Sequence, residues 1–315
     1  MENNKKIPLV VICGPTASGK TALSLSLARY FDAEIVSADS MQIYKGMDIA
    51  TAKPSESEME SVKHHMIGFV ETNENYSVAE YAAKARDVIA DIYGRGKIPF
   101  LVGGTGLYIS SILDNIEFGK ENYDNDIREA LNKRLIAEGP EVLLKELSEF
   151  DQVSAQRIGT SNHRRLIRAI EIYKTTGRTM TSFIEESKLT PSPYNDVRLG
   201  ITYLDRQKLY ERINIRVDEM IKNGLIEEAE DFLKMGYNST GAKAIGYKEL
   251  EPYFRGIITL DEAVENLKRE TRRYAKRQLT WFRRDEKIVW LYRDVMSENE
   301  ILKKALETVE KSLII

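Results

Sequence analysis

Eight consecutive residues near the start of the sequence have the types and spacing needed to bind phosphate. Residues 14–21 read GPTASGKT, which matches the pattern G-x-x-x-x-G-K-[S/T] at each defined position. Glycines let backbone N–H groups turn toward an anion, and the helix that follows adds its positive N-terminal end. Lys20 adds a positive charge, and the Thr21 hydroxyl is of the type that ligates Mg²⁺ in such loops. The sequence therefore predicts a loop that binds a diphosphate or a triphosphate.

A carboxylate after the second predicted strand is the candidate for proton chemistry. Asp39 follows residues 34–37 (EIVS), and loops at the carboxyl ends of parallel strands converge on one crevice. Asp39 is therefore expected near the phosphate loop, as a metal ligand or a general base. An N-cap or an Asx-turn is an equally open reading of this residue. The glycines of residues 103–106 (GGTG), after the third predicted strand, either approach a substrate closely or only turn the chain.

The distribution of charge points to a polyanionic partner, although the total does not. With 46 Lys and Arg against 49 Asp and Glu, the formal charge is −3 and the pI is about 5.9, which argues against nucleic acid. However, residues 268–284 contain eight basic residues and one acidic residue, and residues 163–178 contain five and one. Tyr274, Trp281 and Phe282 are interleaved in the first of these patches. The pattern favours phosphate contacts with aromatic stacking over an ordinary solvated basic helix.

Composition excludes several other classes of site and of protein. The single cysteine, Cys13, cannot form a disulfide framework or a cysteine-based zinc site, and it fits a reducing compartment. Three histidines are too few for a histidine metal centre, and the adjacent His64 and His65 point apart in any regular element. No secretory apolar stretch and no run of ~18 apolar residues is present. We therefore expect a cytoplasmic protein with no membrane partner.

The elements that must position these residues alternate between strands and helices. Buried β-branched runs predict strands over residues 8–13, 34–37, 98–102 and 197–203, and helical spacing predicts helices over 21–30 and 78–93. Amphipathic helices are predicted over 125–138, 141–150 and 164–175, and further helices from residue 204 to the end. The predicted fold is α/β: a P-loop NTPase-like parallel sheet flanked by helices, with an inserted all-helical domain. The expected core is 1–113 and 196–315 with C-terminal helices, and the insertion is 114–195.

Six motifs in one order resemble a known family. They are GPTASGKT (14–21), DSMQIY (39–44), DIATAKP (48–54), LVGGTGLY (101–108), AIGYKE (244–249) and AKRQLTWFRR (275–284). Together they resemble the bacterial type of tRNA dimethylallyltransferases, also called tRNA isopentenyltransferases, over about residues 8–292. The resemblance implies transfer of a dimethylallyl group from dimethylallyl diphosphate to N6 of adenosine 37 beside the tRNA anticodon. N6-dimethylallyladenosine and diphosphate would be the products and Mg²⁺ the cofactor. The tRNA anticodon stem-loop would be the partner, and the protein is expected to be a monomer.

The resemblance also implies a role for individual residues. Asp39 matches the family's general base, Thr21 the hydroxyl near diphosphate and Mg²⁺, and Lys20 a charge that stabilises the diphosphate. The implied diphosphate site is Gly14, Pro15, Thr16, Ala17, Ser18, Gly19, Lys20 and Thr21, with Arg212 and Arg216, whose relative importance the sequence does not decide. The implied tRNA-binding residues are Asp39, Ser40, Met41, Gln42, Thr105, Arg128, Arg164, Arg165, Leu166, Ile167, Arg168, Lys243, Ala244, Ile245, Gly246, Tyr247, Lys248, Lys276, Arg277, Gln278, Leu279, Thr280, Trp281, Phe282 and Arg283. By the same resemblance, the insertion of residues 114–195 is a tRNA-binding domain.

Departures from the family pattern and two alternatives accompany this interpretation; one departure is that His64-His65 lacks the acidic residue that usually follows. Ala50 stands where the family commonly has glycine, and Lys243 where some members have arginine; neither change removes a catalytic group. One alternative is a P-loop kinase of a small metabolite, which leaves both basic patches unexplained. The other is an RNA-binding regulatory NTPase, which would release phosphate from ATP without RNA.

Overall fold

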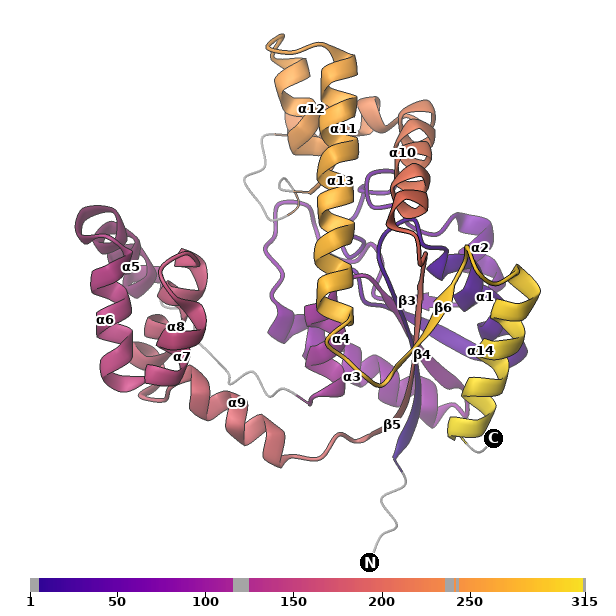
Figure 1. Cartoon of the computed structure of the whole chain (residues 1–315), viewed down its shortest axis with the longest axis horizontal. Coiled ribbons are helices and arrows are strands. Elements are labelled where there is room, and N and C mark those ends of the chain that lie inside the picture. The colour runs from indigo at the N-terminus through magenta and orange to yellow at the C-terminus, as the bar shows by residue number, and fades with distance from the viewer. Residues whose placement is uncertain (1–5, 116–124, 236–240, 242–243, 314–315) are drawn as a thin grey trace, which may run out of the picture. The chain divides into compact units, whose positions relative to one another are not determined.

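A parallel β-sheet lies at the centre of the larger of two compact units (Figure 1). The structure, a computed structural model, describes residues 6–115, 125–235, 241 and 244–313. In this part of the chain the sheet has six strands in the order β3-β2-β4-β1-β5-β6, and every neighbouring pair is parallel. The strands are β1 (Ile7–Cys13), β2 (Ala33–Ser37), β3 (His64–His65), β4 (Ile98–Gly103), β5 (Tyr194–Thr202) and β6 (Ile288–Tyr292). The predicted parallel α/β architecture is confirmed.

Burial of both faces of the sheet explains the apolar runs in its strands. Val10 pairs with Phe100 on one side and Val197 on the other, and all three side chains are buried. Alternate strand residues point to opposite faces, and one face is covered by helices α1 (Lys20–Tyr30) and α14 (Glu298–Leu313) in a shared apolar cluster. Helix α3 (Val78–Gly94) contacts β2, β4 and α4 (Gly106–Leu113). The phosphate loop and the loops after β2 and β4 therefore extend from one edge of a rigid sheet.

A helical layer formed by the C-terminal segments packs beside that edge. It comprises α10 (Arg206–Lys222), α11 (Leu225–Lys234), α12 (Tyr247–Phe254) and α13 (Leu260–Phe282), and a short helix, α2 (Glu56–Ser61), precedes β3. A capping box of Thr259 and Glu262 starts α13, the longest of these helices (Figure 1). The segment after β2 contributes Ile43, Tyr44 and Met47 to the apolar cluster of this layer. The layer thus holds the chain that follows Asp39.

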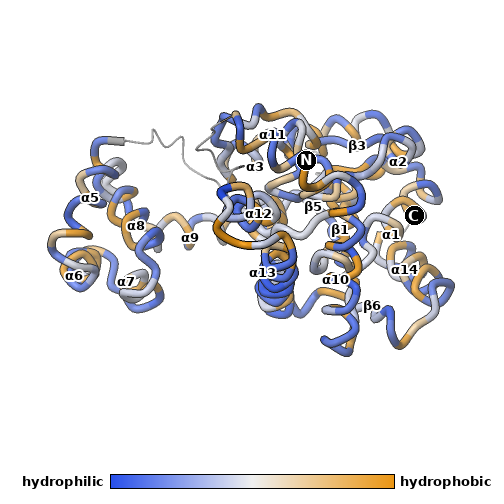
Figure 2. The backbone as a smooth tube through the Cα atoms, turned by 90° about the horizontal axis from the view of Figure 1, so that it is seen from above, coloured by the Kyte–Doolittle hydropathy of each residue, from blue (hydrophilic) through white to orange (hydrophobic). Residues whose placement is uncertain are grey.

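The second compact unit, residues 114–192, is helical. Its helices are α5 (Asn125–Glu138), α6 (Pro140–Phe150), α7 (Gln152–Ile158), α8 (His163–Thr176) and α9 (Met180–Leu189). Hydrophilic and hydrophobic residues alternate along them (Figure 2), and the apolar ones, including Leu143, Leu147, Leu166 and Ile170, form a separate core. The unit ends at 192 rather than the expected 195 because β5 begins at Tyr194 and not at Val197.

Several elements differ from the sequence-based expectation, among them helices α2 and α4, where no helix was predicted. Strand β6 was not predicted, because only helices were expected after β5; its residues IVWLY are partly exposed and carry no alternating pattern. Strand β3 has two residues, too few for any periodic signal. Helices α7 and α9 are short helices that the amphipathic pattern missed. No helix among the described residues is both long and apolar enough to cross a lipid bilayer.

Candidate active site

The predicted phosphate loop connects β1 to the first turn of α1 and has the backbone geometry of an anion nest. Gly19 has a φ of 91°, a left-handed conformation that favours glycine. At Gly14 a Cβ atom would lie 2.3 Å from the carbonyl oxygen of Ile201 in β5, so a larger residue does not fit. The N–H groups of Lys20 and Thr21, in the first turn of α1, have no acceptor among the described residues. These free donors and the helix N-terminus form a site for an anion.

Positive side chains reinforce this loop from two elements. Lys20 donates to the carbonyl oxygens of Gly14 (3.1 Å) and Pro15 (2.7 Å). Burial, and then the positive charge of Arg216, lower the pKa of Lys20 to about 8. Burial likewise lowers the pKa of Arg216, which the Asp39 carboxylate opposes. Arg212, one turn earlier on α10, is exposed. Of the two arginines, Arg216 therefore lies within the electrostatic environment of the loop.

Asp39 forms the Asx-turn that its sequence position allows, and it also keeps one carboxylate oxygen free to act as a base. The Oδ1 atom of Asp39 accepts the backbone N–H groups of Met41 (2.9 Å) and Gln42 (3.4 Å), which is an Asx-type turn. Its Oδ2 atom has no hydrogen-bond partner in the described part of the chain. Ser40 donates its N–H to the Thr105 hydroxyl at 3.0 Å. The turn fixes the carboxylate, and one oxygen is left to accept a proton from a substrate.

The glycines after β4 are required by close packing, which neither sequence reading had considered. A Cβ atom at Gly103 would lie 2.1 Å from the carbonyl oxygen of Ala38, immediately before Asp39. At Gly104 a Cβ would meet the Gln278 amide at 2.2 Å, and at Gly106 the Trp281 ring at 2.2 Å. Because these neighbours are backbone or packed side chains of α13, substitution would displace either the Asp39 turn or α13.

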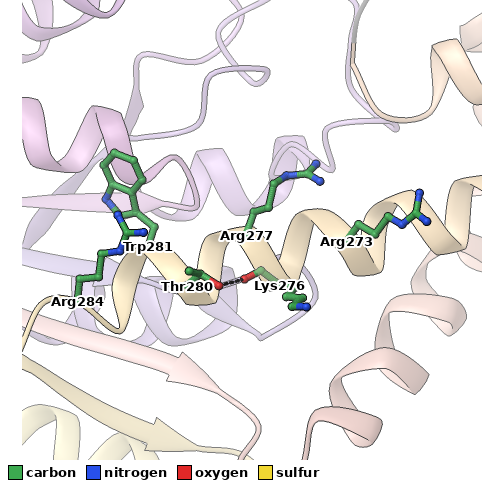
Figure 3. A pocket seen from close by; sticks show the side chains of 6 residues that line it. All are labelled: Arg273, Lys276, Arg277, Thr280, Trp281 and Arg284. Atoms are coloured by element: carbon green, nitrogen blue, oxygen red, sulfur yellow. Dashed lines mark hydrogen bonds between the residues drawn. The ribbon is translucent and has the colours of Figure 1, made fainter. Parts of the chain in front are cut away.

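The C-terminal half of α13 presents a basic surface. Arg273, Lys276, Arg277, Thr280, Trp281 and Arg284 line an open depression of about 450 Å³, and Figure 3 shows the four cationic side chains extending from the helix. Earlier charges of the same run are paired: Lys268 lies 2.8 Å from Asp218. Lys276, Arg277, Arg283 and Arg284 make no ion pair with the described residues. The unneutralised charge is therefore concentrated near the end of α13.

Not every implied tRNA contact on α13 is at the surface. Lys276, Arg277, Thr280 and Arg283 are exposed, and Trp281 is half-buried. Gln278, Leu279 and Phe282 are buried. Gln278 accepts the Thr16 N–H and donates to the Gly104 carbonyl, each at 2.9 Å, so its side chain faces the loops rather than solvent.

In the helical unit the implied contacts divide in the same way. Arg164 and Arg165, at the start of α8, are exposed, whereas Leu166 and Ile167 belong to the core. Arg128 and Arg168 both donate to the buried Glu171 carboxylate, at 2.8 and 3.1 Å. The structure thus brings Arg128 and Arg168 together around one carboxylate and leaves the first turn of α8 exposed.

Glu228 is a site residue that the sequence reasoning missed. Its carboxylate accepts the backbone N–H groups of Asp48 (2.8 Å), Ile49 (2.7 Å) and Ala50 (2.9 Å), together with the hydroxyl of Tyr247 (2.9 Å). Two family motifs therefore meet at one side chain of α11. Glu228 had no distinguishing signal, since it is one of several acidic residues in an amphipathic helix.

Ala50 and the residues of the AIGYKE motif lie in a packed part of the structure, and only Lys248 of the described motif residues is exposed. Ala50 has no left-handed φ, so its backbone does not require a glycine. A Cβ atom at Gly246 would lie only 3.3 Å from the Ala50 Cβ, so the glycine at 246 leaves room for Ala50. Of the implied tRNA contacts in the AIGYKE motif and beside it, Ala244, Gly246 and Tyr247 are buried, Ile245 is half-buried and Lys248 is exposed. Lys243 lies outside the described residues.

The residues present fit a magnesium ion that arrives with a diphosphate better than one held by the protein alone. Among the described residues no group of three or more His, Cys, Asp or Glu could hold a metal. His64 contacts the Val62 carbonyl and His65 the Glu34 carboxylate, each at 2.7 Å. The Thr21 hydroxyl, at the loop, has no hydrogen-bond partner in the described chain. One protein oxygen plus phosphate oxygens and waters is the coordination that Mg²⁺ commonly adopts.

Comparisons with known proteins agree with the motifs. The family described as "IPP transferase" matches residues 42–285, and "Isopentenyl transferase" matches residues 7–74. A tRNA dimethylallyltransferase of Caldanaerobacter subterraneus is 47% identical over 301 residues, which is 95% of this chain and 96% of the relative. One of Bacillus subtilis is 47% identical over 307 residues, 97% of each chain.

Solved structures agree as well. The crystal structure of a tRNA isopentenylpyrophosphate transferase from Bacillus halodurans has a TM-score of 0.73 and 42% identity, covering 98% of this chain and 99% of that one. A eukaryotic dimethylallyltransferase acting on tRNA has a TM-score of 0.80 and 27% identity, covering 95% and 78%. Family match, identity and coverage confirm the resemblance seen in the motifs, and the chain belongs to the tRNA dimethylallyltransferase family.

Proposed function

We propose that this protein transfers the dimethylallyl group of dimethylallyl diphosphate to N6 of adenosine 37 in tRNA. The observation that carries the proposal is the Asp39 carboxylate, held by its Oδ1 atom with Oδ2 free, within the electrostatic environment of Lys20 and Arg216. A base beside an anion site is what an allylic transfer to an amine requires. The names and identities of the relatives support the same reaction.

The amine is the difficult partner in this reaction, because the N6 lone pair of adenine is delocalised into the ring. The base must leave the RNA stack and be held against the allylic carbon. The N6 nitrogen then forms a bond to C1 of the dimethylallyl group while the C1–O bond to diphosphate breaks and its electron pair leaves with the diphosphate. The proton released from N6 passes to Oδ2 of Asp39.

The reaction also requires that the site stabilise the negative charge of the departing diphosphate. The N–H groups of Lys20 and Thr21 and the Lys20 ammonium would hold its oxygens, with Arg216 as a further positive charge. Mg²⁺, bound at the Thr21 hydroxyl and the diphosphate, would neutralise part of the leaving group's charge. A half-buried, partly desolvated set of cations stabilises such an anion more strongly than solvated cations would.

The RNA would be bound by the exposed basic surfaces. Arg277 and Lys276 on α13, and Arg164 and Arg165 on α8, are positioned on their own units to contact phosphates. Trp281 offers an aromatic ring beside the same charges. A metabolite kinase would leave these surfaces without a role. A regulatory NTPase is not favoured either, because the similar proteins are named as dimethylallyltransferases.

The direct test is incubation with dimethylallyl diphosphate, Mg²⁺ and unmodified tRNA, followed by detection of N6-dimethylallyladenosine in the nuclease digest. A tRNA with guanosine at position 37 should give no product. Asp39→Asn keeps the oxygen that closes the turn but loses the base, so turnover should fall roughly 10²–10⁴-fold while RNA affinity is retained. Asp87→Asn, at an exposed position of α3, is the matched control. Loss of RNA affinity alone in Asp39→Asn would contradict the base role.

A further inference from the structure

Helix α13 contacts the loops at the anion site and also carries exposed basic side chains. Tyr274, Gln278 and Trp281, at helical spacing, lie against the loop of residues 103–106. Arg277 is next to Gln278 in sequence and one helical turn from Tyr274 and from Trp281; it is exposed and belongs to the basic surface (Figure 3). One rigid element therefore contacts both the loops around the anion site and the surface proposed to bind RNA.

Gln278 contacts the two loops through two hydrogen bonds of its side chain. Its side chain is 5% exposed. Its carbonyl oxygen accepts the Thr16 N–H of the phosphate loop, and its NH₂ group donates to the Gly104 carbonyl, each at 2.9 Å. One partner is a donor and the other an acceptor, so this arrangement needs an amide and fixes its orientation.

The neighbouring contacts leave the amide little freedom. A Cβ atom at Gly104 would lie 2.2 Å from the Gln278 nitrogen and 3.5 Å from the Gly14 carbonyl oxygen, so the two loops approach each other around this side chain. The Tyr274 side chain also hydrogen-bonds to Thr105 and to Gln278. Thr105 in turn holds the turn of Asp39 through Ser40.

We infer that Gln278 is a positioning residue that couples the basic face of α13 to the phosphate loop, so that RNA and diphosphate bind cooperatively through this amide. Any displacement of α13 by bound RNA would move the acceptor of the Thr16 N–H and the donor to Gly104 together. Linkage then requires that diphosphate in the loop changes RNA affinity by the same factor. The inference rests on the proposed function, because it assumes that RNA occupies the face of Arg277.

The test measures the dissociation constant of inorganic diphosphate, which cannot react, by calorimetry with Mg²⁺ in the presence and absence of saturating unmodified tRNA. The unsubstituted protein should bind diphosphate about fivefold or more tightly with tRNA. In Gln278→Met, which keeps the side-chain length but loses both bonds, this ratio should fall to within about twofold of one. The Gln278→Asn side chain is too short to reach both partners, so its ratio should fall in the same way. Gln207→Met, at an exposed position of α10, should keep the ratio.

Each result has a definite meaning. A purely structural role would lower the thermal midpoint and weaken both ligands while the ratio stayed the same, and that result would overturn the inference. A ratio near one in the unsubstituted protein would overturn it too. Prenyl transfer by the same preparation, measured first, separates these outcomes from failure of the proposed function, which would appear as no product on any tRNA.

Discussion

Raising the pH should remove the contribution of Lys20 to diphosphate binding. Burial and the charge of Arg216 lower the pKa of Lys20 from 10.5 to about 8. Only the protonated amine attracts the anion. Its protonated fraction is about nine-tenths at pH 7 and about one-tenth at pH 9, so the affinity that depends on this charge should fall about tenfold across this interval.

The measurement compares the unsubstituted protein with Lys20→Met, which has the same length and no charge. The ratio of their dissociation constants for diphosphate, measured at half-unit steps from pH 6.5 to 9.5, cancels the titration of the ligand itself. This ratio should be large at pH 7 and about tenfold smaller at pH 9. In the Arg216→Met background the midpoint should move upward, because one neighbouring positive charge is gone.

Two outcomes would refute this reasoning. A ratio that stays constant to pH 9.5 would show that Lys20 remains charged and is not desolvated as the structure indicates. A ratio near one at pH 7 would show that Lys20 keeps its bonds to the loop carbonyls and does not contact the anion.

Two further predictions concern the surfaces around the site. Arg277→Ala should weaken tRNA binding and lower the slope of log affinity against log salt concentration by about 0.7–0.9. Arg255→Ala, at the end of α12 and paired with Glu251, is the control and should leave the slope unchanged. An unchanged slope in Arg277→Ala would show that Arg277 does not contact the RNA. Glu228→Gln should destabilise the fold by about 1–3 kcal/mol in urea unfolding, because an amide cannot accept all of the bonds made by the carboxylate. Glu227→Gln, exposed on the same helix, is its control, and equal stability of the two variants would contradict the structural role.

Much of the site could be predicted because its signals are local. The phosphate loop is eight consecutive residues between a buried run and a helix, and Asp39 directly follows a strand whose end must lie at the same edge of the sheet. What could not be predicted depends on contacts between distant positions. Gln278 meets Thr16 across 262 residues, and Glu228 meets Ala50 across 178. Glu228 is one of several acidic residues on α11, and Gln278 is one polar residue within a basic segment of α13, so no periodicity reveals their partners.

Dependence on contacts between distant positions also explains why β6 was not predicted and why several of the implied tRNA contacts are buried. Strand β6 forms only because β5 presents an unpaired edge to its five residues. Matching α13 to a family motif assigned Gln278 and Phe282 to RNA along with Arg277, although the helix turns the first two inward. A motif identifies a segment, and the packing of that segment decides which of its side chains reach a ligand.

The position of β1 between β4 and β5 affects how the protein can be made. In the folded chain β1 pairs with β4 and with β5. During synthesis its β4 partner is available once residue 103 has emerged, whereas its β5 partner is available only after residues 194–202 follow. At roughly 5–20 residues per second, the roughly 100 residues that separate β4 from the end of β5 take about 5–20 s. The helical unit lies within this interval and has its own core, so it is suited to fold first. For those seconds the nascent chain exposes an apolar strand edge that could pair with a neighbouring polypeptide, and protection of that edge then falls to the ribosome surface or a chaperone.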